Sequence, residues 1–111
     1  MRSLKPELLK AQYEQLGLVF GRHQHGNGPI HFAAEHNGFV FEIYPLSKHK
    51  RNSSAQIRLG FVVQGLKDLM QKLKSSTWEI VREPQETEWG RRAIVEDLDG
   101  RKVELKQALN N

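Results

Sequence analysis

The feature that most constrains this chain is a short strand-like pattern that occurs twice. The segment Gly38-Phe39-Val40-Phe41-Glu42-Ile43 has a counterpart 62 residues later, Gly100-Arg101-Lys102-Val103-Glu104-Leu105. In both copies a glycine comes first, and a glutamate stands directly before the last aliphatic residue. Alternation of apolar and polar residues with a period of two predicts a half-buried strand. The repeat therefore predicts two similar modules.

Each copy of the pattern lies in a predicted hairpin. Residues 92–96 and 102–107 alternate like strands, and Asp97-Leu98-Asp99-Gly100 between them is typical of a tight turn in which glycine supplies a positive φ. The first copy, 39–44, is likewise preceded by a strand-like stretch, 30–34, and a polar turn. Both modules are thus expected to end in an antiparallel hairpin.

An amphipathic helix is predicted in each module. Pro6 favours a helix start and Gly17 a stop, with apolar residues at helical spacing between them. In the second module Gly65 precedes an apolar stripe that runs from Leu66 to Leu73.

The remaining segments predict a strand that begins at 18–20 and is broken from His23 onward, and further strands at 57–63 and 78–82. Residues 84–89, which begin with Pro84, are expected to form a loop. With these strands the second module has the order strand, helix, strand, strand, strand.

The offset of 62 residues also places Leu8 on Met70 and Phe32 on Ile94. Applied to the strand at 57–63, it reaches back to before Met1, so the first module is expected to lack its opening strand. Either the reading frame starts late or the protein folds without that strand. The exposed sheet edge would then be covered by the N-terminal segment or by a partner chain, and a homodimer is the economical arrangement.

Length and composition fit one soluble domain. The chain has 111 residues, which we divide into module one at 1–45, a linker at 46–55 and module two at 56–111. No apolar run approaches the roughly 18 residues that span a bilayer. The first residues lack the apolar core of a signal peptide, so a cytoplasmic protein without membrane partners is expected.

Charge and cysteine content exclude further classes of function. The chain has no cysteine, which removes disulfides and zinc–thiolate sites. Its net charge of +4 is spread evenly over the two halves, so no nucleic-acid partner is expected.

Five motifs carry a family resemblance: Tyr13-x-x-Leu16-Gly17-Leu18-x-Phe20, Phe41-Glu42-Ile43-Tyr44, Leu59-Gly60-Phe61-Val62-Val63, Trp89-Gly90-x-Arg92 and Asp97-x-Asp99-Gly100-x-x-x-Glu104-Leu105. Their order and spacing resemble the vicinal oxygen chelate superfamily, which contains glyoxalase I, extradiol dioxygenases, fosfomycin-resistance enzymes and bleomycin-binding proteins. The resemblance implies an α+β fold of two βαβββ modules that form a cup-shaped half-barrel, commonly in a dimer.

The resemblance also implies where a metal would bind. Metal-using members take ligands from the first and last strand of each module, and the last-strand positions fall on Glu42 and Glu104. The first-strand position of module two falls on Arg58, whose guanidinium offers only donors and cannot bind a metal. We therefore expect a cavity without a divalent metal or other cofactor, in which Arg58 supplies positive charge between the two carboxylates. If a metal is present, Glu42 and Glu104 would be its ligands.

Three further residues are candidates for the cavity. Tyr44 and Trp89 would add aromatic surface, and Arg92 could bind an anionic group bidentately. The alternatives are ordinary core packing for the aromatic residues and a strand-face salt bridge for Arg92. Likewise, Glu42 and Glu104 could simply face solvent.

Histidines offer another route to a metal site. His23 and His25 alternate along the chain and His31 opens the next strand, and imidazole is the commonest metal ligand. However, His23 and His25 adjoin a glycine-rich connection, where histidines are usually solvated.

The expected function is binding of a small molecule by a glyoxalase/bleomycin-resistance-like protein without the classical metal site. A metal-dependent lyase or dioxygenase of the glyoxalase type is the alternative, and a drug-sequestering resistance protein is a minor one. The latter binds cationic ligands, which a chain of charge +4 repels at long range. Whether any reaction is catalysed does not follow from the sequence.

Overall fold

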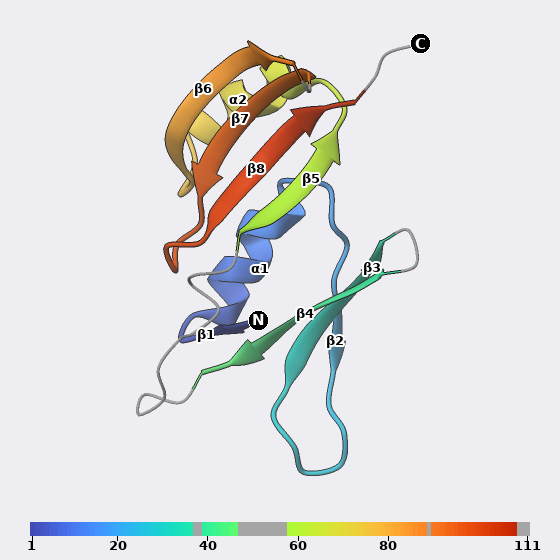
Figure 1. Ribbon diagram of the computed structural model, residues 1–111. Coiled ribbons are helices and arrows are strands. Elements are labelled where there is room, and N and C mark those ends of the chain that lie inside the picture. Colours follow the sequence, from blue (N-terminus) through green and yellow to red (C-terminus); the bar gives the residue numbers. More distant parts are fainter. Residues whose placement is uncertain (37–38, 47–57, 89, 109–111) are drawn as a thin grey trace. The chain divides into compact units, whose positions relative to one another are not determined.

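The computed structural model describes residues 1–36, 39–46, 58–88 and 90–108. The chain divides into two compact units, Met1–Ser54 and Ala55–Asn111, each with one helix and one four-stranded sheet (Figure 1). Most of the predicted linker, the first residue of the strand predicted at 57–63 and Trp89 lie outside the described residues. Among the residues described, neither helix has the length or apolar content to cross a lipid bilayer.

The first unit contains β1 (Arg2–Ser3), α1 (Pro6–Glu14), β2 (Gly21–His23), β3 (His31–His36) and β4 (Phe39–Pro45). The strand order in its sheet is β1-β4-β3-β2. Strands β2, β3 and β4 are antiparallel neighbours, whereas β1 pairs with β4 in parallel.

Helix α1 packs on one face of the first sheet. It begins at Pro6, which has no backbone N–H and therefore leaves no unpaired donor at the first helical position. The side chains of Leu9 and Tyr13 are completely buried. The centroid of the Tyr13 ring lies 5.1 Å from that of Phe41 on β4. Ile43, two residues further along the same strand, is fully buried. The helix thereby fixes which side of β4 faces the core.

The second unit contains β5 (Leu59–Val63), α2 (Leu66–Lys74), β6 (Glu79–Thr87), β7 (Gly90–Glu96) and β8 (Lys102–Gln107). Its strand order is β5-β8-β7-β6, with β5 parallel to β8 and the other pairs antiparallel. Element order and pairing are thus the same in both units, which confirms the predicted α+β fold of two related modules.

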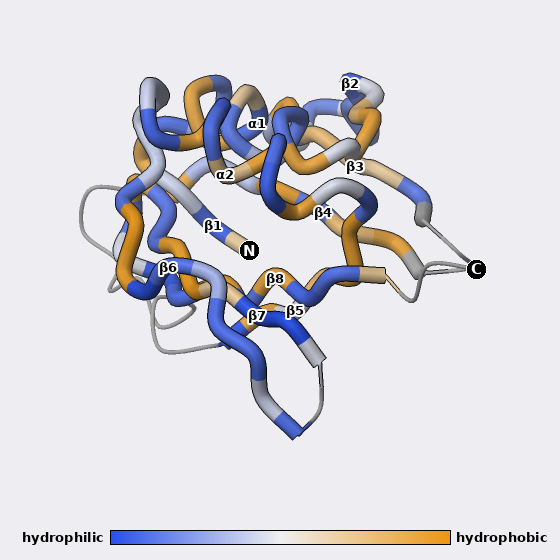
Figure 2. The backbone as a smooth tube through the Cα atoms, turned by 90° about the horizontal axis from the view of Figure 1, so that it is seen from above, coloured by the Kyte–Doolittle hydropathy of each residue, from blue (hydrophilic) through white to orange (hydrophobic). Residues whose placement is uncertain are grey.

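The core of the second unit follows the alternation seen in the sequence. Val103 and Leu105 on β8 are fully buried, as are their β7 neighbours Val95 and Ala93. Figure 2 shows the corresponding change between hydrophobic and hydrophilic residues along β8. Helix α2 covers the apolar face, and its first N–H, from Leu66, donates to the side-chain oxygen of Gln107 at 2.7 Å. A strand side chain therefore caps the helix.

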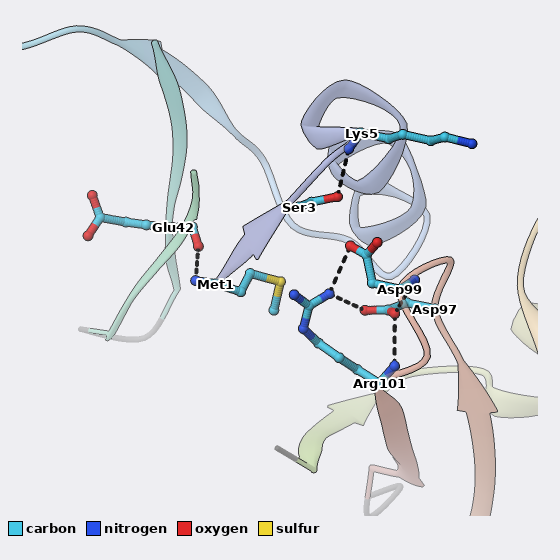
Figure 3. Close-up of polar contacts among 7 residues, drawn as sticks. All are labelled: Met1, Ser3, Lys5, Glu42, Asp97, Asp99 and Arg101. Carbon is cyan, nitrogen blue, oxygen red and sulfur yellow. Dashed lines mark hydrogen bonds and ion pairs between the residues drawn. The ribbon is translucent and has the colours of Figure 1, made fainter. Parts of the chain in front are cut away.

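The turn between β7 and β8 is held by a buried charged network (Figure 3). The guanidinium of Arg101 binds the carboxylates of Asp97 at 3.2 Å and Asp99 at 3.1 Å, and the Arg101 and Asp97 side chains are almost fully buried. Asp97 Oδ1 also accepts the backbone N–H groups of Asp99 and Arg101. These contacts satisfy polar groups that would otherwise be costly to bury.

Gly100 closes this turn with a φ of +87°, as the sequence predicted. We expect Gly100→Ala to lower the free energy of unfolding by about 1–2 kcal/mol, because a Cβ disfavours the left-handed region. Gly60→Ala is the control, since a Cβ meets no atom within 4 Å at either position and Gly60 has no positive φ. Chemical denaturation would compare the two, and equal effects would rule out backbone strain as the cause.

Two predicted strand boundaries were wrong. The strand predicted to begin at Leu18 begins only at Gly21, as β2. Strand β6 continues through Pro84 to Thr87 rather than ending before it, with register shifts between Ile80 and Arg82 and between Arg82 and Gln85. The irregularity removes the proline from regular pairing, so its missing N–H does not end the strand.

The single offset of 62 residues was also too simple. Pairing of Phe32 with Ile43 corresponds to pairing of Ala93 with Leu105, so Phe32 is equivalent to Ala93 and not to Ile94. The helices begin 60 residues apart. As a result Leu8 is exposed whereas Met70, its predicted equivalent, is buried.

In place of a full opening strand the first unit has the two-residue strand β1. Tyr44 N donates to Met1 O at 2.8 Å and Leu46 N donates to Ser3 O at 2.7 Å, while the Met1 nitrogen binds Glu42 O at 2.7 Å (Figure 3). Of the two ways proposed to cover the β4 edge, the N-terminal segment thus covers this part of it. The predicted homodimer is not tested by a single chain.

Candidate functional site

The two predicted site glutamates lie on the sheet faces that the helices do not cover. On β8, Val103 and Leu105 face α2, so Glu104 between them projects from the other face. On β4, Phe41 and Ile43 pack on the α1 side and Glu42 projects away from it in the same manner. The two glutamates therefore hold equivalent places in their own units.

In the second unit Glu104 is paired with Arg92. The Arg92 Nη1 to Glu104 Oε1 distance is 2.7 Å, and the two side chains are 31% and 25% exposed. The pair is diagonal on the sheet, since the direct neighbours of Glu104 are Ile94 on β7 and Gly60 on β5. Partial shielding from water makes such a charge-assisted contact stronger than one on an open surface.

One buried donor of Arg92, its Nε–H, has no hydrogen-bond partner among the described residues. A buried donor without an acceptor is costly, and a ligand oxygen would remove that cost. A second pair on the same face, Lys102 with Glu96, leaves no such donor in the described part of the chain.

In the first unit Glu42 lies beside a buried histidine. His31 Nε2 is 3.6 Å from Glu42 Oε2, and Nδ1 is 3.4 Å from the Pro29 carbonyl oxygen. The His31 ring stacks on Tyr44 with centroids 4.4 Å apart and planes 8° apart. Three predicted or considered residues are thus brought together on one sheet face.

Further rings extend this stack. The rings of His23 and His25 lie 5.9 Å and 5.2 Å from that of His31, and the Arg2 guanidinium lies 5.4 Å from the Tyr44 ring centroid. His23 pairs directly with His31 across β2 and β3, although β2 ends there, before His25. His31 was considered only as a metal ligand from the sequence. The predicted turn at 35–38 would pair Ala34 with Phe39, whereas in the structure His36 pairs with Phe39, so the place of His31 opposite Tyr44 could not be found from the predicted hairpin.

The other candidates are placed as follows. Arg58 is exposed and lies directly before β5, two residues from the Gly60 that faces Glu104. Trp89 lies outside the described residues. Glu42 and Tyr44 belong to the first unit, and Arg58, Arg92 and Glu104 to the second, so a cavity shared by all of them stays a prediction.

The residues of the second unit do not fit a metal ion. The carboxylate of Glu104 is engaged by a guanidinium, and its neighbour on β5 is a glycine, which has no side chain to donate. In the described ranges no three or more His, Cys, Asp or Glu side chains gather closely enough to hold an ion. Tight binding of a divalent ion needs about three or four such ligands.

Comparisons with known proteins identify the fold. The model of the glyoxalase/bleomycin resistance protein/dioxygenase superfamily matches residues 9–105. No curated protein sequence matches the chain significantly.

Solved structures resemble nearly the whole chain at low sequence identity. TioX from Micromonospora sp. ML1 is 17% identical with a TM-score of 0.74, covering 98% of this chain and 94% of its own. A bleomycin-binding protein complexed with bleomycin is 21% identical with a TM-score of 0.63 and the same two coverages. A mutant of the fosfomycin resistance protein FosX from Listeria monocytogenes, complexed with Mn(II) and 1S,2S-dihydroxypropylphosphonic acid, is 12% identical with a TM-score of 0.71, covering 98% of this chain and 88% of its own.

Proposed function

Because this chain belongs to the glyoxalase/bleomycin resistance protein/dioxygenase superfamily, we propose that it binds a small molecule without a divalent metal. The ligand would lie against the uncovered sheet faces and meet Glu42, Tyr44 and Arg58 together with Arg92 and Glu104. Trp89 would complete the aromatic part of this site.

The observation that carries the proposal is the Arg92–Glu104 pair. The family resemblance implies a metal-ligand position at Glu104, and the Arg92 guanidinium, 2.7 Å from this carboxylate, would supply the positive charge that an ion would supply there. Metal binding would have to displace this contact. The buried Nε–H of Arg92 favours a ligand with an oxygen acceptor, such as a carboxylate or phosphonate.

The first test is metal stoichiometry. Purified protein is incubated with manganese, nickel or zinc, passed over a desalting column and measured by elemental analysis. We expect a substoichiometric amount of every ion, because Glu104 is held by Arg92. One tightly held ion per chain would refute the proposal.

The second part of the test locates the ligand. A panel of small carboxylates and phosphonates is titrated into labelled protein, and backbone amide shifts are followed by NMR. Binding should shift Tyr44 and Glu42 in one unit together with Arg92 and Glu104 in the other, and Arg92→Ala should weaken it roughly tenfold or more. Lys102→Ala, on the same face and paired with Glu96, is the matched control. Shifts confined to one unit would contradict a shared cavity.

A metal-dependent lyase or dioxygenase is the second candidate, favoured by one contact. His31 and Glu42 combine an imidazole and a carboxylate 3.6 Å apart, and both groups are metal ligands in proteins. If an ion is retained in the first test, its loss in His31→Gln and Glu42→Gln would support this candidate.

Two narrower expectations remain proposals. A drug-sequestering role rests on the likeness to the bleomycin-binding protein, and saturable micromolar binding of bleomycin in a calorimetric titration would favour it. The homodimer is supported by its frequency in the superfamily, and light scattering at micromolar concentration tests it.

A further inference from the structure

A separate cavity lies on the helix-covered side of the second sheet. It has a volume of about 410 Å³, and one wall is a stripe of α2 formed by Lys67, Met70 and Lys74, which are three to four residues apart. Such a volume is within the range of small-molecule pockets. Because all of its lining residues belong to the second unit, the cavity does not depend on the first unit.

The sequence explains why this end of the core stays open. Buried Ala93 and Leu105 pair across β7 and β8, and the next residues on the same face are Arg91 and Gln107. These two are polar and cannot continue the apolar core. Gln107 is instead turned to the start of α2, where its oxygen accepts the N–H of Leu66. The cavity forms between this polar end of the sheet and the helix.

The charge of the lining favours an anion. Lys67, Lys74 and Arg91 contribute three cations, and Glu83 is the only carboxylate among the cavity's lining residues. Lys67 has no ion-pair partner in the part of the chain that the structure describes. The Lys74–Glu83 pair, at 3.2 Å, is largely exposed, so an incoming anion can compete with it.

The same holds for Arg91, whose contact with Glu86 is 3.5 Å long and also exposed. The apolar part of the lining comes from Met70, which is buried, and from Pro84 at the irregular part of β6. Methionine adapts its shape to different apolar groups.

We infer that this cavity is a second binding site, which takes an organic anion with a compact apolar body, such as a carboxylate or phosphate monoester. The charged group would lie among Lys67, Lys74 and Arg91, and the apolar body against Met70 and Pro84. The site lies on the opposite sheet face from Arg92 and Glu104, so it is independent of the function proposed above.

Phenyl phosphate is the probe, titrated into labelled full-length protein and followed by amide shifts. We expect saturable shifts at Met70 and Arg91, with tighter binding than for inorganic phosphate or phenol alone. Lys67→Gln and Arg91→Gln should each weaken binding roughly tenfold. Lys72→Gln is the matched control, because Lys72 is an exposed lysine of the same helix that does not line the cavity.

Three outcomes would overturn the inference. The first is amide shifts that do not saturate at roughly millimolar phenyl phosphate. The second is amide shifts centred on Glu42 or Glu104 instead of Met70. The third is an equal loss of phenyl phosphate affinity in Lys72→Gln and Lys67→Gln. Circular dichroism of each variant establishes that the fold is kept, which is expected since the changed side chains are exposed.

Discussion

Replacing Arg101 by methionine is expected to lower the free energy of unfolding by about 3–5 kcal/mol. The Arg101 side chain is 1% exposed and that of Asp97 is fully buried, so the substitution leaves an ionised carboxylate in the interior without its cation. Methionine fills much of the same volume, so the loss reports the charge rather than a cavity. Equilibrium denaturation with urea measures the change.

The matched control is Arg91→Met in the same hairpin. Arg91 also pairs with a carboxylate, but its side chain is 49% exposed and that of Glu86 is 72% exposed. Exposed pairs contribute little because water and salt screen them, so the control should cost less than about 1 kcal/mol. Changing Asp97 to asparagine together with Arg101→Met should recover part of the loss, since no unpaired charge then remains at that pair. Equal effects of the two arginine substitutions would show that burial of the network is unimportant.

The second large effect is expected in helix α1. Leu9→Ala should lower the free energy of unfolding by about 2–5 kcal/mol, because it removes a fully buried side chain from the contact between the helix and the first sheet. Leu8→Ala is the same chemical change one residue earlier, where the side chain is 58% exposed, and it should cost less than about 1 kcal/mol.

Denaturation curves of both variants, compared with that of the wild type, test the assignment of the buried helix face. A larger loss in Leu8→Ala than in Leu9→Ala would contradict it. Such a result would mean that the helix is rotated about its axis relative to the structure described above.

Much of the fold could be predicted because it depends on local pattern. The alternation around Glu42 and Glu104 predicts two strands with one polar face, and the Asp97–Gly100 segment predicts the turn between β7 and β8. Both depend on short-range chemistry that the sequence displays directly. The position of the two glutamates on the uncovered faces follows from the same alternation.

Features that depend on pairing between distant strands were harder to predict. The equivalence of Phe32 with Ala93 depends on which residue of β3 faces Ile43, and a shift of one residue moves a side chain to the other face. A loop was expected from Pro84 onward, but β6 continues through this residue. The irregularity that accommodates the proline has no clear sequence signal.

The contacts of the candidate site residues could not be predicted from the sequence. Glu104 is bound by Arg92 and Glu42 lies beside His31, two contacts that the sequence did not indicate, and the expected role of Arg58 between the carboxylates stays a prediction. An arginine in a sequence does not reveal which of several acidic residues its long side chain reaches. The sequence did not indicate that Arg101 is buried. Arginine is rarely buried without a paired carboxylate, and which carboxylates it meets depends on the fold.

The irregular course of β6 has a consequence for how copies of this protein can meet. Among the described strands β6 pairs with β7 alone, so its outer side would be a template on which a foreign strand could add. Pro84 offers no donor there, and the two register shifts break the regular row of amide groups that fibril growth requires. This edge of the second unit is therefore a poor template for strand-to-strand addition between copies of the protein.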